Sequence, residues 1–149
     1  SNLGGRERLY VERIAANGMH LLRIVDGVLD LTKVEAGKLA FRREPTDVRT
    51  LLDDVGATMA PQVARDVVLA IDAPEVIAPV VTDVDRLRQV LLNLVGNALK
   101  FTLTGRVVLR ARCAPGTSWL AAIEVEDTGV GIPADRQSVI FEPFEQGET

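Results

Sequence analysis

The stretch Val84–Phe101, VDRLRQVLLNLVGNALKF, decides the fold, because it reads as one helix whose N-cap is Asp83. Three polar side chains, Asn93, Asn97 and Lys100, fall on one face at 100° per residue. Most of the remaining positions are apolar, so we expect the helix to be buried around the rest of its circumference. A buried amide without a partner costs roughly 1–3 kcal/mol, so the stripe needs partners.

The amide stripe has two interpretations. Asparagine oxygens are hard, neutral ligands of the kind that Mg²⁺ accepts beside water and phosphate, and Lys100 is one turn from Asn97 for a phosphate contact. A solvated edge, or a stripe that caps neighbouring loops, explains the same residues. This helix alone does not favour the ligand site.

A second motif, Asp127-Thr128-Gly129-Val130-Gly131-Ile132, follows a predicted strand, Trp119–Asp127. Strict alternation predicts that Asp127 continues the inward register of Trp119, Ala121, Ile123 and Val125 and is therefore buried. Gly129 and Gly131 would let the backbone turn tightly and approach a ligand. A buried carboxylate beside such a loop suits a planar base with an exocyclic amine, but a simple strand-ending turn is the common alternative.

The other predicted elements give an α+β fold, in which a long helical arm precedes a two-layer α/β sandwich. The arm, Arg6–Ala36, carries apolar residues at seven-residue spacing, which is typical of a helix packed lengthwise on others. Ile14, Leu21 and Val28 form one series of this seam, and Asn17, Ile24 and Leu31 form the other. After the arm we expect a strand or linker at Leu39–Glu44 and a helix that is capped by Pro45-Thr46-Asp47 and ends near Ala60. Further strands are predicted at Val67–Ile71, Pro79–Thr82 and Arg106–Ala111, followed by a hairpin turn at Pro115-Gly116.

Composition excludes several classes. The 149 residues carry a net charge of −4, which argues against nucleic acid as a partner. No apolar run is long enough to cross a bilayer, so we expect no membrane contact from this segment and a cytoplasmic location, although a longer parent protein can be membrane-anchored. The single cysteine, Cys113, excludes an internal disulfide and a cysteine-based zinc site.

Taken together, these motifs resemble those of the sensor histidine kinases of two-component systems. Asn93–Thr102 looks like the N box, Asp127–Ile132 like the G1 box and Ile140–Gln146 like the F box that opens the ATP lid. His20–Lys38 resembles the second dimerisation helix and its exit. The resemblance implies that residues 1–37 are that helix, without the first helix of the hairpin. Residues 38–149 would be the first part of a Bergerat-type (GHKL) ATP-binding domain with a mixed sheet, ending in the lid.

The resemblance also implies roles for the residues of these boxes. Asn97 would hold the Mg²⁺ that bridges the ATP phosphates, and Asn93 and Lys100 would contact Mg²⁺-bound or free phosphate oxygens. Asp127 would accept from the adenine amine. The other nucleotide-binding residues of this set are Phe101 in the pocket wall, Gly129, Gly131 and Ile132 in the loop around the base, and Phe141 and Phe144 at the lid hinge.

The reaction implied is transfer of the ATP γ-phosphate to a histidine and then to a response regulator aspartate, by a homodimeric parent protein. ATP hydrolases of this fold carry a glutamate four residues before the Mg²⁺-binding asparagine. Here that position is Asn93, which cannot act as a general base, so transfer is favoured over hydrolysis. One alternative is a non-catalytic nucleotide-binding or dimerisation module. Another is a related GHKL ATPase or anti-sigma-type kinase, which the helical arm disfavours because the arm belongs to the dimerisation hairpin.

The sequence carries no expected phosphate acceptor. The family's acceptor histidine lies on the first dimerisation helix, directly before an acid. The only histidine, His20, is followed by Leu21, so we expect it not to be phosphorylated and assign no catalytic residue. The expected sandwich also lacks one helix and an edge of its sheet, which would leave an apolar face uncovered. We therefore do not expect this chain alone to autophosphorylate.

Overall fold

The computed structural model describes residues 40–138, residue 140 and part of an N-terminal segment. The chain divides into two compact units, Ser1–Phe41 and Arg42–Thr149, which are described separately here. The described residues of the N-terminal segment are Glu7, Tyr10, Val11, Arg13, Ile14, Asn17, Gly18, Leu21, Val25 and Gly27.

In the first unit, every described residue from Glu7 to Gly27 is helical, which agrees with the predicted arm as far as it is described. Ile14 and Leu21, from one seven-residue series of the seam, expose 70% and 63% of their surface. An apolar stripe this exposed leaves room for a partner helix. The rest of the predicted arm, including His20, lies outside the described residues.

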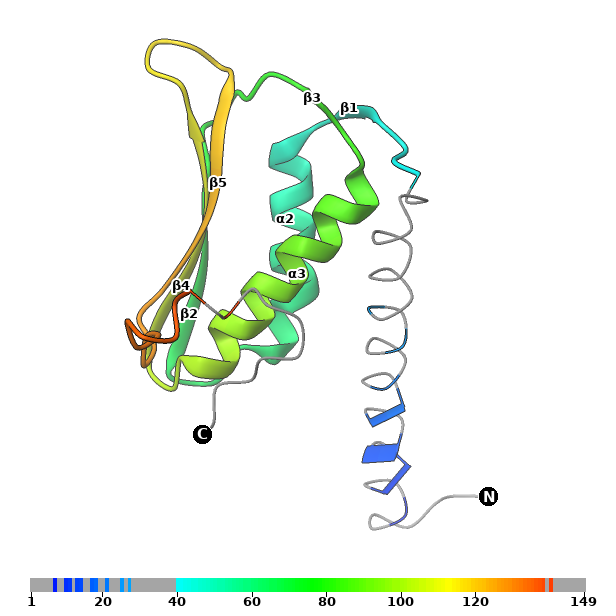
Figure 1. The fold of residues 1–149 in the computed structure, drawn as a ribbon, viewed down its shortest axis with the longest axis vertical. Helices are drawn as coiled ribbons and strands as arrows, with labels where there is room; N and C mark the ends of the chain where they lie inside the picture. The colour runs from blue at the N-terminus through cyan, green and yellow to red at the C-terminus, as the bar shows by residue number, and fades with distance from the viewer. Residues whose placement is uncertain are drawn as a thin grey trace. The chain divides into compact units, whose positions relative to one another are not determined.

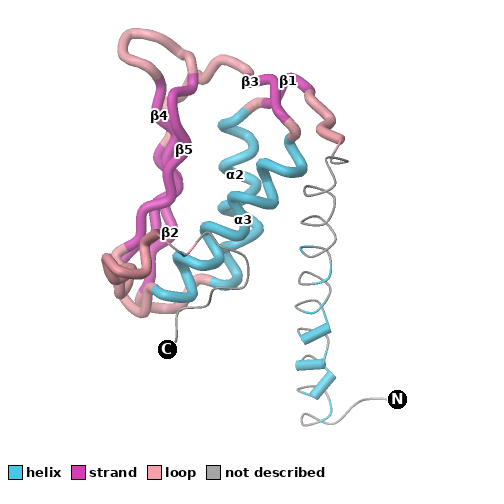
Figure 2. The backbone as a smooth tube through the Cα atoms, viewed as in Figure 1, coloured by secondary structure: helices cyan, strands magenta, loops and turns pink. Residues whose placement is uncertain are grey.

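In the second unit, two helices pack on one face of a three-stranded sheet, as Figures 1 and 2 show. This two-layer arrangement confirms the predicted α+β class. The helices are α2 (Val48–Met59) and α3 (Val84–Phe101), with a short 3₁₀ turn, η1 (Ala60–Gln62), after α2; the sheet strands are β2 (Val67–Asp72), β4 (Gly105–Cys113) and β5 (Leu120–Asp127). A separate antiparallel pair is formed by β1 (Glu44–Thr46) and β3 (Val80–Thr82).

Both helices begin at an aspartate cap, as predicted. Asp47 accepts from the backbone N–H of Thr50 at 3.1 Å and so caps α2, which satisfies one of the free N–H groups at a helix start. Asp83 caps α3 by accepting from the Arg86 N–H at 3.1 Å, and its other oxygen accepts from the Arg42 N–H at 2.9 Å. These backbone hydrogen bonds lower the pKa of both carboxyls. The β1 strand starts at Glu44, at the end of the range predicted as strand or linker.

The core lies between the helices and the sheet. On α2 the buried residues recur at helical spacing and lie on one face: Val48, Leu51, Leu52, Val55 and Met59. On α3 only Leu91, Val95 and Ala98 are buried. They pack with Val107, Leu109 and Ala111, which alternate along β4 and therefore share its helix-facing side.

The sheet is mixed, which is also as predicted. Parallel pairing joins β2 to β4, with Ile71 opposite Leu109, and antiparallel pairing joins β4 to β5, with Val107 opposite Asp127. The connection from β2 to β4 contains α3, because parallel neighbours need a crossover. Within the described residues β5 is paired on one side only.

The predicted alternation along β5 is wrong at its first residues. The pairing shifts at Arg112/Cys113, so that Cys113 lies opposite Leu120 and Ala121 becomes the extra residue of a β-bulge. In consequence Leu120 packs against the core, whereas Ala121 is exposed and Trp119 exposes 71% of its surface. Ile123 and Val125 keep the predicted inward register.

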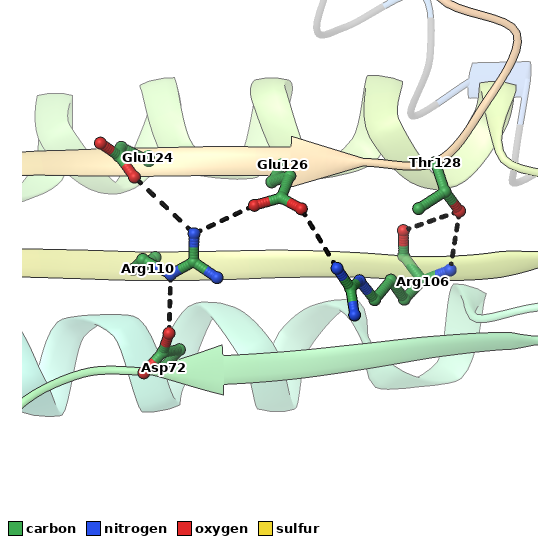
Figure 3. Close-up of polar contacts among 6 residues, drawn as sticks. All are labelled: Asp72, Arg106, Arg110, Glu124, Glu126 and Thr128. Carbon is green, nitrogen blue, oxygen red and sulfur yellow. Dashed lines mark hydrogen bonds and ion pairs between the residues drawn. The ribbon is translucent and has the colours of Figure 1, made fainter.

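The face of the sheet away from the helices is charged (Figure 3). Arg110 on β4 binds Asp72 of β2 at 2.6 Å and Glu126 of β5 at 3.0 Å. Hydrogen bonds to Asp72 and then Glu126 raise the pKa of the Arg110 guanidinium, and the same guanidinium lowers the pKa of Glu126. The charged side chains of this face thus pair with one another across the strands, and the candidate site lies elsewhere.

Candidate functional site

The open face of α3 carries the predicted polar stripe. Asn93, Asn97 and Lys100 are all exposed, on the side of the helix away from Val95. The expectation that the rest of the circumference is buried is wrong, because α3 covers the sheet with one side only. Its exposed side includes Val90, Leu94 and Phe101, which expose 52%, 43% and 44% of their surface. Amides, a cation and apolar side chains therefore share one accessible surface.

Among the described residues, the two amides of this surface lack an internal partner. Within the described residues, neither the Asn93 nor the Asn97 side chain makes a hydrogen bond, whereas both aspartate caps do. Lys100 places its ammonium 5.1 Å from the centre of the Phe101 ring, which is within the range of a cation–π contact. The stripe therefore does not cap neighbouring loops in the described part of the chain. A solvated edge and a ligand face are the two remaining interpretations.

The loop after β5 lies at the end of the helix-facing side of the sheet. Asp127 pairs with the fully buried Val107, so it has the predicted inward register. Asp127 is nevertheless exposed, and its predicted burial is wrong, because the strand ends at this residue. Its Oδ1 accepts from the Gly129 N–H at 2.9 Å. Its second oxygen has no partner among the described residues.

The same loop touches the C-terminal end of α3. A Cβ built on Gly129 would lie 2.5 Å from the carbonyl oxygen of Phe101, so the two backbones are in direct contact. Gly131 has φ of +70°, a conformation that glycine adopts without strain. Ile132 exposes 49% of its surface. The structure thus brings the loop residues next to Phe101 and the end of the polar stripe.

Two predicted site residues cannot be placed, since Phe141 and Phe144 lie outside the described residues. One residue of the loop was not predicted as part of the site. Thr128 fastens the loop to β4 through its hydroxyl, which accepts from the Arg106 N–H at 3.0 Å. A threonine directly after a strand is so common that the sequence offered no signal for this contact.

Other possible sites in the described part of the chain do not coincide with this surface. A groove of about 350 Å³ lies between α2 and β2, but none of the predicted site residues lines it. Among the described residues no group of three or more His, Cys, Asp or Glu side chains is placed to hold a metal ion. No helix in that part of the chain is both long and apolar enough to cross a membrane.

Comparison with known proteins identifies the family. Residues 82–149 match the histidine kinase-, DNA gyrase B-, and HSP90-like ATPase family. The sensory/regulatory protein RpfC of Xanthomonas campestris pv. campestris is 36% identical over 99% of this chain and 21% of its own length. The signal transduction histidine-protein kinase BarA of Escherichia coli (strain K12) is 35% identical over 95% of the chain and 16% of its own length. Residues 82–149 belong to this ATPase family, and the chain as a whole is similar to sensor histidine kinases.

Solved structures agree with this assignment. Full-length ShkA in complex with AMPPNP matches 98% of this chain with a TM-score of 0.78 and 33% identity, over 31% of the ShkA chain. Acinetobacter baumannii histidine kinase AdeS, at 20% identity, has a TM-score of 0.75 over 96% of the chain and 68% of its own, and supports the fold alone. The chain spans only about a fifth of the length of RpfC. The comparisons do not favour the alternative classes considered above.

Proposed function

We propose that this chain binds Mg-ATP across the open face of α3 and the loop after β5. The observation that carries the proposal is the pair of exposed amides, Asn93 and Asn97, which have no partner within the described residues although they lie on a helix with three buried apolar residues. Lys100 adds a positive charge on the same face. Such a surface suits an anionic ligand that brings its own metal ion.

The donor set fits a phosphate-bound Mg²⁺. The Asn97 amide oxygen would hold the ion, while Asn93 and Lys100 would contact metal-bound or free phosphate oxygens. Because the described residues offer no acidic cluster, one neutral protein oxygen would leave the other coordination sites to phosphate and water, which is how Mg²⁺ is commonly bound. When bound, the ion would neutralise charge on the transferred phosphate.

The loop after β5 would bind the adenine. One oxygen of Asp127 is occupied by the Gly129 N–H and the other is available for the exocyclic amine. The exposed part of Phe101 offers an apolar surface for the base. Gly131 and Ile132 complete the same loop, and Phe141 and Phe144 would form the lid hinge. The likeness to ShkA, which was solved in complex with AMPPNP, supports a nucleotide ligand.

For the whole protein we propose transfer of the γ-phosphate to a histidine and then to a response regulator aspartate. The absence of a carboxylate at Asn93 disfavours activation of water. The relatives named as histidine kinases and the structure of ThkA in complex with response regulator TrrA support these partners. His20, which is followed by Leu21 and not by an acid, would not be the acceptor. The exposed seam residues Ile14 and Leu21 support a homodimer formed through the arm.

The test is a calorimetric titration of the purified chain with Mg-ADP and Mg-ATP. We expect micromolar to low-millimolar binding that is lost in Asn97→Ala and in Asp127→Asn. Asp53→Asn is the matched control, since Asp53 is exposed on α2 and bonded to Arg49. Binding that neither site variant weakens would refute the assigned site, and an equal loss in the control would show that the effect is not specific.

A further inference from the structure

At the end of β5, a side-chain hydroxyl takes the place of the backbone carbonyl that would continue the ladder. Beyond the pair Val107–Asp127, the next residues opposite each other are Arg106 and Thr128. The Thr128 N–H donates to the Arg106 carbonyl at 3.1 Å, as an antiparallel ladder requires. The Arg106 N–H, however, donates to the Thr128 hydroxyl at 3.0 Å, where the Thr128 carbonyl would continue the ladder. Figure 3 shows both atoms of Arg106 facing the hydroxyl.

The hydroxyl is held on both sides. It also donates to the Arg106 carbonyl oxygen, at 3.4 Å. Gly105 makes room for it, because a Cβ at Gly105 would overlap the Thr128 hydroxyl, and Gly105 has φ of +113°. The Gly105 N–H is itself bound to the Asp66 carbonyl at 3.0 Å, at the start of the β2–β4 pair. Thr128 is therefore anchored to the end of the sheet at which β2 and β4 begin to pair.

This exchange allows the chain to leave the sheet at once. With the Arg106 N–H already satisfied, the Thr128 carbonyl is released from the ladder and the backbone turns between Asp127 and Gly129. The turn places the Gly129 N–H on Asp127 Oδ1 at 2.9 Å. It also seats Gly129 against the Phe101 carbonyl. One oxygen of Asp127 is thereby fixed in place while the other stays available.

We propose that Thr128 is a positioning residue for nucleotide-base recognition: its hydroxyl, held by Arg106, sets the orientation of the Asp127 carboxylate that receives the exocyclic amine of adenine. The proposal rests on the proposed function, since it takes Asp127 as the base-binding group. Thr128 itself does not touch the nucleotide. Its removal should therefore weaken discrimination for the amine more than binding of the phosphates.

The experiment compares Thr128→Val, which keeps the shape and removes the hydroxyl, with Thr128→Ser, which keeps the hydroxyl. The first measurement is amide hydrogen exchange in the free chain, resolved by NMR at Gly129 and, as the reference in the sheet interior, at Leu109. We expect exchange at Gly129 to be at least about tenfold faster in Thr128→Val and unchanged in Thr128→Ser, with Leu109 unaffected in both. A purely structural role would speed exchange at Leu109 as well.

The second measurement is calorimetric affinity for Mg-ADP and for the magnesium complex of inosine diphosphate, which lacks the amine. Thr128→Val should lose most of the preference for ADP while its affinity for the inosine nucleotide changes less than about twofold, and Thr128→Ser should keep the preference. Unchanged Gly129 exchange, or an unchanged preference in Thr128→Val while Asp127→Asn loses binding of Mg-ADP, would overturn the role of Thr128 alone. A preference that Asp127→Asn leaves intact would overturn the proposed function together with this inference.

Discussion

Gly129 lies so close to Phe101 that a Cβ on the glycine would stand 2.5 Å from the Phe101 carbonyl oxygen and 2.9 Å from its carbonyl carbon. Both are backbone atoms at the end of α3, which cannot move aside like a flexible side chain. The contact joins the loop after β5 to the helix that carries the polar stripe. The proposed adenine-binding loop and the proposed phosphate-binding face of α3 can therefore stay this close only while residue 129 has no side chain.

The first prediction concerns this contact. Gly129→Ala should push the loop away from α3, lower the melting temperature and weaken Mg-ADP binding at least about tenfold, because Asp127 and Phe101 no longer face the same ligand. Calorimetric titration and thermal unfolding measure the two effects. Binding at the wild-type level would show that the loop can shift without cost to the site.

Gly96→Ala is the control for that substitution. A Cβ at Gly96 would meet Met59 Cε at 3.5 Å, which is an ordinary contact, and Gly96 lies in the interior of α3. Replacing glycine by alanine inside a helix should stabilise the fold by about 0.5–1 kcal/mol. The two glycines should thus respond in opposite directions in the same unfolding assay.

The second prediction is a pH dependence of stability that originates at Asp83. Hydrogen bonds from the backbone N–H groups of Arg42 and then Arg86 lower its pKa below the ordinary 3.8. A lowered pKa in the folded state adds stability that is complete above the unfolded pKa and is lost as the pH falls through the folded one. Asp83→Asn should therefore melt below the wild type near neutral pH, and this difference should shrink below about pH 4. Thermal unfolding across the pH range measures it, and a difference that is constant with pH would contradict the role of the charge.

The third prediction concerns the ion pairs of the outer sheet face. Arg110 lies between Asp72 and Glu126 and is 3.9 Å from Glu124, so Arg110→Gln leaves three carboxylates close together without their common cation. The melting temperature should fall more than in Arg112→Gln, because Arg112 contacts Glu124 alone among the described residues. Raising the salt concentration should reduce the difference, since exposed charges are screened. Equal melting temperatures for the two variants would show that the ion pairs contribute nothing measurable.

Local signals in the sequence were sufficient for the helices. The bounds of α3, Val84–Phe101, and its cap Asp83 agree with the prediction, because capping and helical periodicity depend on neighbours within a few residues. The polar stripe was found for the same reason. The burial expected for the rest of α3 was wrong, since the number of apolar residues on a helix does not reveal how much of its circumference the sheet covers.

Strand orientation depended on information that the sequence does not display. Alternation gave the inward register of Ile123 and Val125. The bulge at Ala121 arises because Cys113 of β4 pairs with Leu120, and Trp119 is exposed as a result. Asp127 was placed correctly in register and wrongly in burial, because burial at a strand end depends on where the strand stops. The strand ends where the Thr128 hydroxyl takes the Arg106 N–H, a contact that has no periodic pattern in the sequence.

The parallel pair of β2 and β4 has a consequence for folding, because the segment that it closes contains α3. The β4–β5 hairpin is local and can form early, whereas the β2–β4 pair closes a long loop and must form later. Once it has formed, α3 lies in the connection between two paired strands and packs on the core that they share with α2. The surface that we propose binds ATP should then appear and disappear together with the whole unit, in a single cooperative step. A nucleotide bound there would delay global unfolding by mass action, so thermal shift would report occupancy of the site even without a functional assay.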